Sequence, residues 1–505
     1  MYNERKIGIL LSYIKVVLSV LINIVYVPIL LHYLGKSEYG LYQIVGSFFS
    51  YITVFESCMA SGVMRNYCNA LGEGNNELAM DTLSTAHRIY RIMSLLMIGI
   101  GIVVVVVFRF FYRDSFSPNE LQESGLILDI LFLNLFVTLW GSIYLTVITG
   151  KERFIFLRIT DIVLQIAQPV MVILCVAHIP YAISVSSAIA FLNILNVILR
   201  WWYVQFRMNI KIPKQKLNRK IAKEVVSLAS AILIGGIADQ IFWKTDQIIL
   251  GKMFSTAVVA VYSVGAQIYM MYMQFGTQVA SVFYPRVSIL YNEVNGLKKV
   301  SDLFIQVGRI TLFVIMLILS GFIIFGRDFF GLWVGDGYDQ AYWVAIVVMI
   351  PFSIDLAQTL GMSILQLAGK YNFRAKMYLL SALLNIITTV LLSRLIGIVG
   401  AAISTGISML LTNGLIMNWY YCKHVGLDIP RYWKETIGIW KMTSILTIIM
   451  LIAKSVFRIK YTSYAVLGIA IVLYTAVYAF SMLKWVATIS ENEQIKCAIR
   501  KVYNH

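Results

Sequence analysis

A single lysine, Lys15, lies inside an otherwise uncharged aliphatic stretch that is long enough to cross a lipid bilayer, Ile7–Leu31. On a helix, the polar side chains of this stretch share one face with the lysine: Ser12, Lys15, Ser19 and Asn23. An ammonium group near mid-membrane is costly among lipid chains, so this face must meet a protein interior or a water-filled cavity. Lys15 is therefore either paired inside a helix bundle or part of a pathway for an anionic cargo.

Two further apolar segments carry polar stripes. The stripe of segment 41–62 includes Gln43 and Ser47, and that of segment 257–285 includes three glutamines: Gln267, Gln274 and Gln278. We expect both stripes to line a central cleft. The alternative is that they hydrogen-bond neighbouring helices and only hold the bundle together.

Acidic residues within apolar segments are candidates for ion coupling. Asp161 shares a helix face with Gln165, and Asp239 and Asp355 lie in later segments. A carboxyl group that alternates between water and a bundle interior can bind and release a proton or a cation. A static ion pair is the alternative for each acid.

The sequence contains none of the short motifs of catalysis or nucleotide binding. HExxH, GxSxG, the P-loop and the glycine-rich dinucleotide motif are all missing, and the five cysteines form no CxxC pair. We therefore expect no enzyme activity, no cofactor and no metal site. Without an ATP-binding motif, transport would depend on an ion gradient, the substrate gradient or a partner.

The composition places the chain among all-α polytopic membrane proteins. Hydrophobic residues make up 59% of the 505 residues, charged residues only 13%, and the mean hydropathy is +0.78. Fourteen apolar segments are predicted to span the membrane, at 7–31, 41–62, 89–112, 125–148, 158–177, 182–204, 225–250, 257–285, 309–326, 340–368, 375–396, 398–421, 434–456 and 462–486.

The net charge of +17 follows the membrane topology and does not indicate a nucleic-acid partner. If the N-terminus is cytoplasmic, 30 of the 42 Lys and Arg residues lie on the cytoplasmic side and 10 on the other side. This bias follows the positive-inside rule and predicts that both termini are cytoplasmic.

The second half of the chain repeats the first. At a shift of 220 residues, Asp161 and Gln165 meet Ser381 and Asn385, and other polar positions align in the same order. We predict two parallel six-helix lobes. The expected divisions are an N-terminal lobe at 1–210, a basic cytoplasmic linker at 211–224, a C-terminal lobe at 225–423, two extra helices at 424–490 and a cytoplasmic tail at 491–505.

Four stretches carry a family resemblance. They are PILLHYLGKSEYGLYQIVGS at Pro28–Ser47, TDQIILGKMFSTAVVAVYSVG at Thr245–Gly265, GLWVGDGY at Gly331–Tyr338, and the GK-x-x-F turns that begin at Gly150 and Gly369. With these, the chain resembles the Wzx-like flippases of the multidrug/oligosaccharidyl-lipid/polysaccharide (MOP) exporter superfamily, over residues up to about 421. These motifs mark the fold and do not identify the cargo.

The resemblance implies a V-shaped bundle, like that of multidrug and toxin exporters, in the bacterial plasma membrane. It implies a cargo of undecaprenyl-pyrophosphate-linked oligosaccharide, such as an O-antigen or capsule unit, flipped from the inner to the outer leaflet. It also implies H+ or Na+ coupling, contact with membrane lipids, and a polymerase and chain-length regulator in the same pathway. Lys15 matches the cations expected to meet the pyrophosphate. The alternatives are a drug/cation antiporter of the same superfamily, and a polytopic polymerase or acyltransferase.

Overall fold

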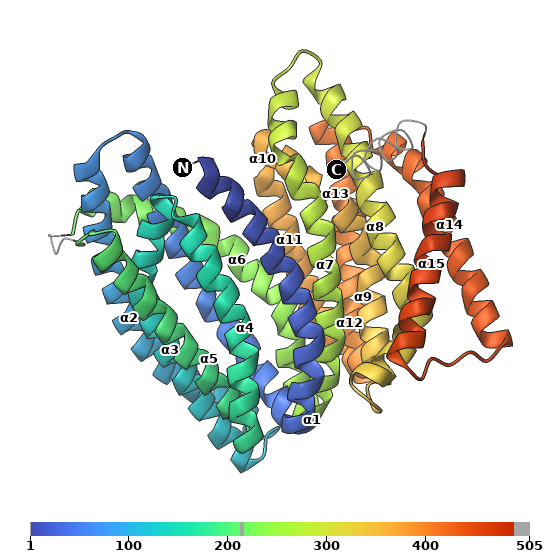
Figure 1. Ribbon diagram of the computed structural model, residues 1–505, viewed down its shortest axis with the longest axis horizontal. Coiled ribbons are helices and arrows are strands. Elements are labelled where there is room, and N and C mark those ends of the chain that lie inside the picture. The colour runs from blue at the N-terminus through green and yellow to red at the C-terminus, as the bar shows by residue number, and fades with distance from the viewer. Residues whose placement is uncertain (1, 213–216, 489–505) are drawn as a thin grey trace. The chain divides into compact units, whose positions relative to one another are not determined.

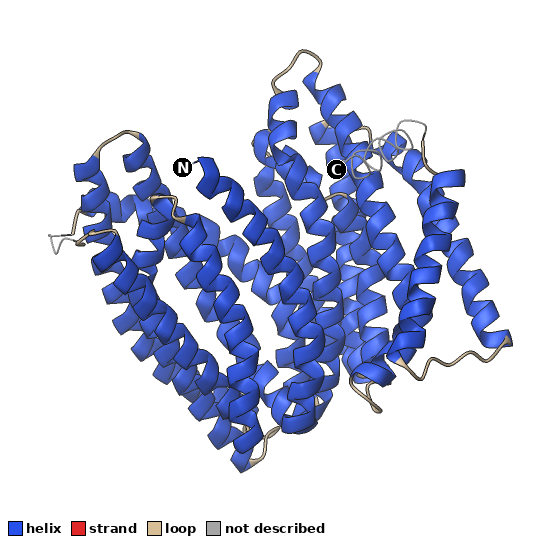
Figure 2. Ribbon diagram, viewed as in Figure 1, coloured by secondary structure: helices blue, strands red, loops and turns tan. Residues whose placement is uncertain are grey.

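The computed structural model describes residues 2–212 and 217–488. The side chains of residues 2–14, 16–17, 279–282 and 284 are not described, and these include that of Ser12. The predicted tail 491–505 lies outside the described residues. Every regular element in the described ranges is helical (Figure 2). Contacts divide the chain into two units, 1–263 and 264–505.

The first unit is built from six helices, a short π-helix and the start of a seventh helix (Figure 1). Their bounds are α1 Tyr2–Gly72, α2 Asn76–Tyr112, α3 Pro118–Gly150, α4 Phe154–His178, α5 Ala182–Trp202, η1 Tyr203–Arg207, α6 Arg219–Met253 and α7 Thr256–Tyr291. The second unit takes the rest of α7 and all later elements. These are α8 Gly296–Trp333, α9 Asp339–Ala357, α10 Leu360–Leu367, α11 Tyr371–Ile396, α12 Ile398–Met409, η2 Leu410–Ile416, α13 Met417–Tyr420, η3 Tyr421–Val425, α14 Ile429–Val456 and α15 Tyr464–Trp485.

The predicted all-α polytopic class is confirmed. Within the described ranges, 13 helices are long and apolar enough to cross a membrane, and the first of them contains two predicted segments. These two segments are continuous in α1 except at Gly35, whose backbone is not helical (φ 71°, ψ 178°). Glycine adopts this positive φ at little cost, so one residue turns the chain where the sequence predicted a longer loop.

Local signals set other helix ends. Ser117 accepts a hydrogen bond from the backbone N–H of Glu120, and the Glu120 carboxylate accepts one from the N–H of Ser117. This reciprocal cap, followed by Pro118, fixes the start of α3. Asn218 caps α6 by accepting from the backbone N–H of Lys220 at 3.1 Å, so the helix begins inside the predicted linker 211–224.

The contact division differs from the predicted lobe boundary at 210–225, because α6 packs along α1 in the first unit. The two helices approach closely at glycines. A Cβ on Gly236 would lie 2.6 Å from the side chain of Val54, and one on Gly251 would lie 2.8 Å from that of Ile44. The predicted lobes describe the sequence repeat, and the equivalence of the two halves stays a prediction.

One pair of aromatic contacts supports that repeat. In the first unit Phe156 of α4 stacks on Tyr203 of η1, with centroids 3.7 Å apart and an interplanar angle of 8°. In the second unit Phe373 of α11 stacks on Tyr420 of α13 at 3.8 Å and 6°. Both partners are shifted by 217 residues. The same contact therefore joins the start of one apolar helix to the end of the next apolar stretch in each unit.

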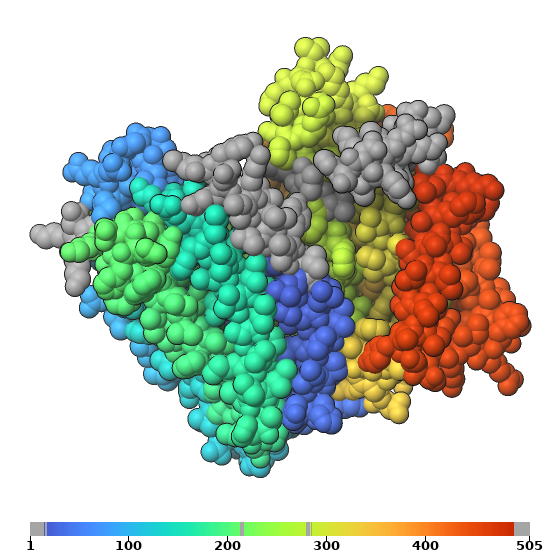
Figure 3. Space-filling model, viewed as in Figure 1, coloured from blue at the N-terminus to red at the C-terminus, as the bar shows by residue number. Residues whose placement is uncertain are grey.

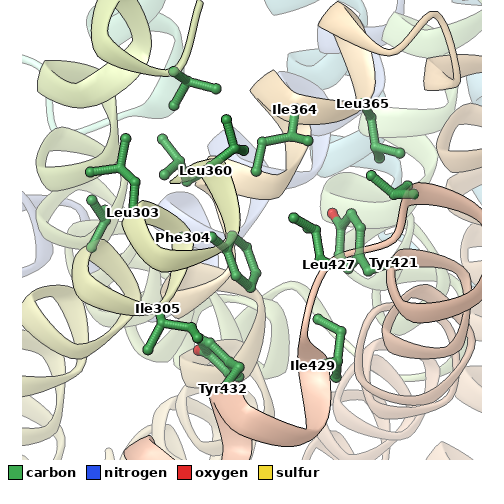
Figure 4. Close-up of a cluster of buried hydrophobic side chains, with 14 of the residues drawn as sticks. Leu303, Phe304, Ile305, Leu360, Ile364, Leu365, Tyr421, Leu427, Ile429 and Tyr432 are labelled. Atoms are coloured by element: carbon green, nitrogen blue, oxygen red, sulfur yellow. The ribbon is translucent and has the colours of Figure 1, made fainter. Parts of the chain in front are cut away.

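The second unit has an apolar core where α8, α10, η3 and α14 meet (Figure 4). Phe304, Leu360, Tyr421 and Tyr432 are all nearly inaccessible to solvent in this core. The predicted segment 340–368 is broken here into α9 and α10, because the chain leaves the helix at Gln358. The Gln358 amide instead exchanges hydrogen bonds with the amide of Asn418, at 2.8 and 3.2 Å.

The two last helices, α14 and α15, are attached to α8 in the second unit. The buried guanidinium of Arg309 on α8 donates to the backbone carbonyl of Glu435 on α14 and, at 3.0 Å, to that of Val486 just after α15. The outward faces of both helices, red in Figure 3, expose aliphatic side chains such as Ile448, Ile452 and Val472. Such faces are typical of helices that contact lipid.

Candidate functional site

Three cations meet one carboxylate in the first unit. The Lys15 ammonium lies 2.9 Å from Oδ2 of Asp161. The Arg158 guanidinium lies 3.6 Å from the same oxygen, and that of Arg200 lies 3.6 Å from Oδ1. The sequence had assigned Lys15 to the cargo and Asp161 to ion coupling, and the structure brings both residues into this one cluster. We call Lys15, Arg158, Asp161 and Arg200 the charge cluster.

Three helices position the charge cluster: α1 supplies Lys15, α4 supplies Arg158 and Asp161, and α5 supplies Arg200. Figure 1 shows α1 beside α4, and α4 and α5 also pack on each other. Asp161 lies about 10 Å of helix from the start of α4, and Arg200 lies in the last turn of α5. Both ends are predicted to be cytoplasmic, and with that topology Lys15 would lie nearer the inner surface than the mid-membrane depth expected from the sequence.

A second acid and two amides surround the charge cluster. The Glu56 carboxylate accepts a 3.0 Å hydrogen bond from Ser142 and is close enough to Arg200 for the charges to attract. Gln165 follows Asp161 by about one turn on α4, and Asn196 precedes Arg200 by about one turn on α5. The buried side-chain oxygens of Gln165 and Asn196, like Nε of Arg200, have no hydrogen-bond partner among the described residues. Buried polar atoms of this kind are rare and indicate room for a further polar partner.

The other predicted residues on α1 make local contacts. Ser19 and Asn23 are half-buried, and the Asn23 amide donates to the backbone carbonyl of Ser19 at 2.9 Å. Ser47 is buried and donates to the side-chain oxygen of Gln247 on α6, whereas Gln43 is half-buried. Ser47 therefore contacts α6. For this residue, the contact is the one expected from the alternative in which the stripe hydrogen-bonds a neighbouring helix.

The remaining predicted residues lie elsewhere in the chain. Asp239 is half-buried on α6 in the first unit, where its charge interacts with that of Lys244. The predicted glutamines lie on the part of α7 that belongs to the second unit: Gln267, Gln274 and Gln278. Their place in a common cleft with α1 stays a prediction.

Asp355 belongs to a separate ion pair in the second unit. Nη2 of Arg374 lies 3.4 Å from Oδ1 of Asp355, and Nη1 of the same arginine donates to the hydroxyl of Tyr421 at 3.2 Å. Arg374 is buried, and its side chain is only 10% exposed. A carboxylate paired in this way to a buried guanidinium is typical of a fixed structural contact.

Sequence reasoning missed Arg158 and Arg200 as site residues, because both were counted as topology determinants at the cytoplasmic ends of segments. A signal was present in segment 182–204. Asn193, Asn196 and Arg200 are spaced by three and four residues and so share one helix face. Reading this face through to the end of the helix would have placed Arg200 with the two amides.

The charge cluster is chemically suited to bind a phosphate. It carries three cations against one acid, and its side chains remain between 16% and 37% exposed. Guanidinium groups bind phosphate oxygens in pairs, and an ammonium adds a compact point charge. The fold and the site therefore define a class, that of polytopic membrane proteins with a basic cluster among their membrane-spanning helices.

Comparisons with known proteins identify the family. The family model described as polysaccharide biosynthesis protein matches residues 6–290, and the chain belongs to that family. A Shigella flexneri protein named as an O-antigen transporter is 21% identical over 77% of this chain and 91% of its own length. A Haloferax volcanii protein named as a low-salt glycan biosynthesis flippase is 22% identical over 42% of this chain and 44% of its own length.

Solved structures of two transport proteins share this fold. The lipid II flippase MurJ superposes with a TM-score of 0.69 at 13% identity, over 94% of this chain and 98% of its own. A multidrug resistance MATE family transporter of the MOP superfamily superposes with a TM-score of 0.63 at 12% identity, over 82% and 96%. The resemblance noted in the sequence is confirmed: this is a multi-pass membrane protein of the polysaccharide biosynthesis protein family, similar to proteins named as transporters and flippases.

Proposed function

We propose that the chain flips undecaprenyl-pyrophosphate-linked oligosaccharide repeat units from the inner to the outer leaflet of a bacterial plasma membrane. Lys15, Arg158 and Arg200 bind the pyrophosphate in this proposal. The observation that carries it is the convergence of these three cations on one carboxylate near helix ends predicted to be cytoplasmic. The phosphates of an inner-leaflet lipid lie at that level, so the cargo meets the charge cluster as it enters.

The polar residues on the helices would lower the cost of moving the polar part of this cargo across the membrane. The polyprenyl tail can remain in lipid throughout, whereas the glycan and the pyrophosphate lose strong hydration if they enter hydrocarbon. A path lined by Lys15, Ser19 and Asn23 on α1 offers them polar contacts. We propose that Gln267, Gln274 and Gln278 of α7 contribute hydrogen bonds to the glycan, since amide side chains both donate and accept.

The same observation weighs against the alternative of a drug/cation antiporter. A cationic cargo requires an excess of acid at its binding site, and the charge cluster has an excess of base. The alternative of a polymerase or acyltransferase is not favoured by the family matches, which are to proteins named as transporters or flippases.

The proposal is tested by reconstituting the purified protein in vesicles with fluorescent undecaprenyl-pyrophosphate oligosaccharide. We expect the labelled glycan to become accessible to a membrane-impermeant quencher on the opposite face only in vesicles that contain the protein. Formation of a new glycosidic bond would instead indicate a polymerase. Uptake of a lipophilic cation without glycan movement would indicate an antiporter.

We further propose that an H+ or Na+ gradient drives transport. Asp239 and Asp355 are the acids proposed to exchange the ion, and each already interacts with a cation, Lys244 for Asp239 and Arg374 for Asp355. Imposing a pH or Na+ gradient across the same vesicles tests coupling, since only the coupled ion should change the rate of glycan translocation. In the cell, a polymerase and a chain-length regulator would receive the product on the outer face.

The proposed direction requires both termini in the cytoplasm. Reporter fusions at residues 35, 120, 215, 335 and 505 should indicate outside, outside, cytoplasm, outside and cytoplasm. The expectation rests on the threefold excess of Lys and Arg in the predicted cytoplasmic segments. A cytoplasmic signal at residue 335 would contradict the parallel repeat of the two halves.

A further inference from the structure

We propose that Asp161 is an exchangeable counter-ion: it occupies the place of the cargo phosphate in the empty site, and the arriving pyrophosphate displaces it from the three cations. This inference rests on the proposed function and specifies how its binding site is regulated. It differs from the role expected from the sequence, in which Asp161 itself carries the coupling ion.

The geometry of the charge cluster is that of an occupied anion site. Both carboxylate oxygens are in use, Oδ2 by Lys15 and Arg158 and Oδ1 by Arg200. The cations come from three different helices, and one acid is their shared centre. A bound phosphate would present oxygens in the same way, with the same charge sign and a similar size.

The positive charges of the cluster exceed its negative charge, so the site favours an anion that carries more charge than one carboxylate. Asp161 supplies one negative charge to three cations, and Glu56 is the further acid that attracts Arg200. Glu56 is itself held by Ser142. A pyrophosphate diester carries a negative charge on each phosphate group, so it satisfies the cations better than a single carboxylate does.

Exposure separates this cluster from a static ion pair. The side chains of Lys15 and Arg158 are 37% and 36% exposed, so an incoming anion can reach them. The Arg374 side chain in the second unit is only 10% exposed and is additionally hydrogen-bonded to Tyr421. Nε of Arg200 in the cluster, and the side-chain oxygen of Gln165 one turn from Asp161, have no hydrogen-bond partner among the described residues. Both can therefore bond to an incoming group.

An exchangeable counter-ion solves a kinetic problem of flipping. Three uncompensated cations would hold a pyrophosphate so firmly that release would limit the cycle, and they would repel one another in the empty protein. With Asp161 present, the carboxylate competes for the cations and returns to them when the phosphate leaves. The competing carboxylate lowers the affinity for the pyrophosphate and so speeds its release, which each transport cycle requires.

Asp161→Asn in the full-length protein tests this inference, because asparagine keeps the shape and removes the charge. Binding of undecaprenyl pyrophosphate, measured on the protein in lipid nanodiscs, should tighten by about tenfold, while glycan translocation in vesicles should slow. Asp161→Glu, which keeps a counter-ion, should bind with nearly the affinity of the unchanged protein. Asp328→Asn is the matched control: its carboxylate pairs with Lys454 at 2.6 Å and is 16% exposed, and binding should not change.

The outcomes are distinct. Unchanged or weaker binding by Asp161→Asn, with thermal stability intact, overturns the counter-ion role. If glycan translocation by Asp161→Asn no longer depends on pH and undecaprenyl pyrophosphate binds no more tightly, Asp161 is assigned to proton coupling instead. If the unchanged protein binds undecaprenyl pyrophosphate no better than undecaprenol, the proposed function itself fails.

A measurement on the unchanged protein covers the case in which Asp161→Asn does not fold. Carbodiimide labelling of Asp161, detected by mass spectrometry, should increase when undecaprenyl pyrophosphate is added, because the carboxylate leaves its cations. Undecaprenol should have no such effect. Equal labelling with both lipids would contradict displacement.

Discussion

Cells that carry Lys15→Glu should lose surface glycan while keeping normal amounts of the protein in the membrane. The new carboxylate would face Asp161 at the position where an ammonium now lies 2.9 Å away, and it would repel an arriving phosphate. Lys15→Met should reduce glycan display by more than about tenfold, since one charge-assisted contact to the phosphate is lost. Lys15→Arg should retain much of the display.

The charge cluster makes this a clean test of Lys15. Removing the lysine does not leave Asp161 as an isolated charge, because Arg158 and Arg200 stay within 3.6 Å of its carboxylate. We therefore expect Lys15→Met to fold, and its amount in the membrane is measured in parallel. Full glycan display by Lys15→Met would remove Lys15 from the cargo site and favour a packing role.

The second large effect is expected at Gly40, where α1 and the first turn of α7 touch. A Cβ on Gly40 would lie 1.8 Å from the backbone carbonyl oxygen of Thr256. Backbone cannot move aside as a flexible side chain can, so Gly40→Ala should lower the free energy of unfolding by at least about 2 kcal/mol. The thermal unfolding of the purified protein in detergent is the measurement.

Gly46→Ala is the matched control for that substitution. Gly46 lies in the same helix, and a Cβ there would have no atom within 4 Å. Alanine in place of glycine in a helix is favourable by up to about 1 kcal/mol, so Gly46→Ala should be neutral or stabilising. Equal thermal stability of the two variants would show that α1 and α7 do not approach as closely as described.

The helices were predictable because their signal is length and polarity, which the sequence displays directly. A bilayer requires about 20 apolar residues per span, and the 14 predicted segments are helical, although segment 340–368 is divided between α9 and α10. The contact of the Gln358 amide with the amide of Asn418 was not predictable, because the two residues lie 60 residues apart in sequence. The short turn at Gly35 also gave no signal beyond glycine itself.

The candidate site was predictable only in part. A lysine or an aspartate in an apolar segment is conspicuous by itself, so Lys15 and Asp161 were identified separately. That they pair depends on how α1 and α4 pack, and 146 residues separate them in sequence. Arg158 and Arg200 were hidden by a second physical role, because basic residues at helix ends also determine topology.

The anchoring of the two last helices through Arg309 constrains how this chain could be shortened. Deleting the residues after 423 would take away two carbonyl oxygens that now accept hydrogen bonds from a buried guanidinium, those of Glu435 and Val486. A buried guanidinium that loses its hydrogen-bond partners is costly. A twelve-helix descendant would therefore have to acquire a neutral residue at position 309 before, or together with, the loss of its C-terminal pair. Arg309 therefore makes loss of α14 and α15 unfavourable as long as the arginine is present.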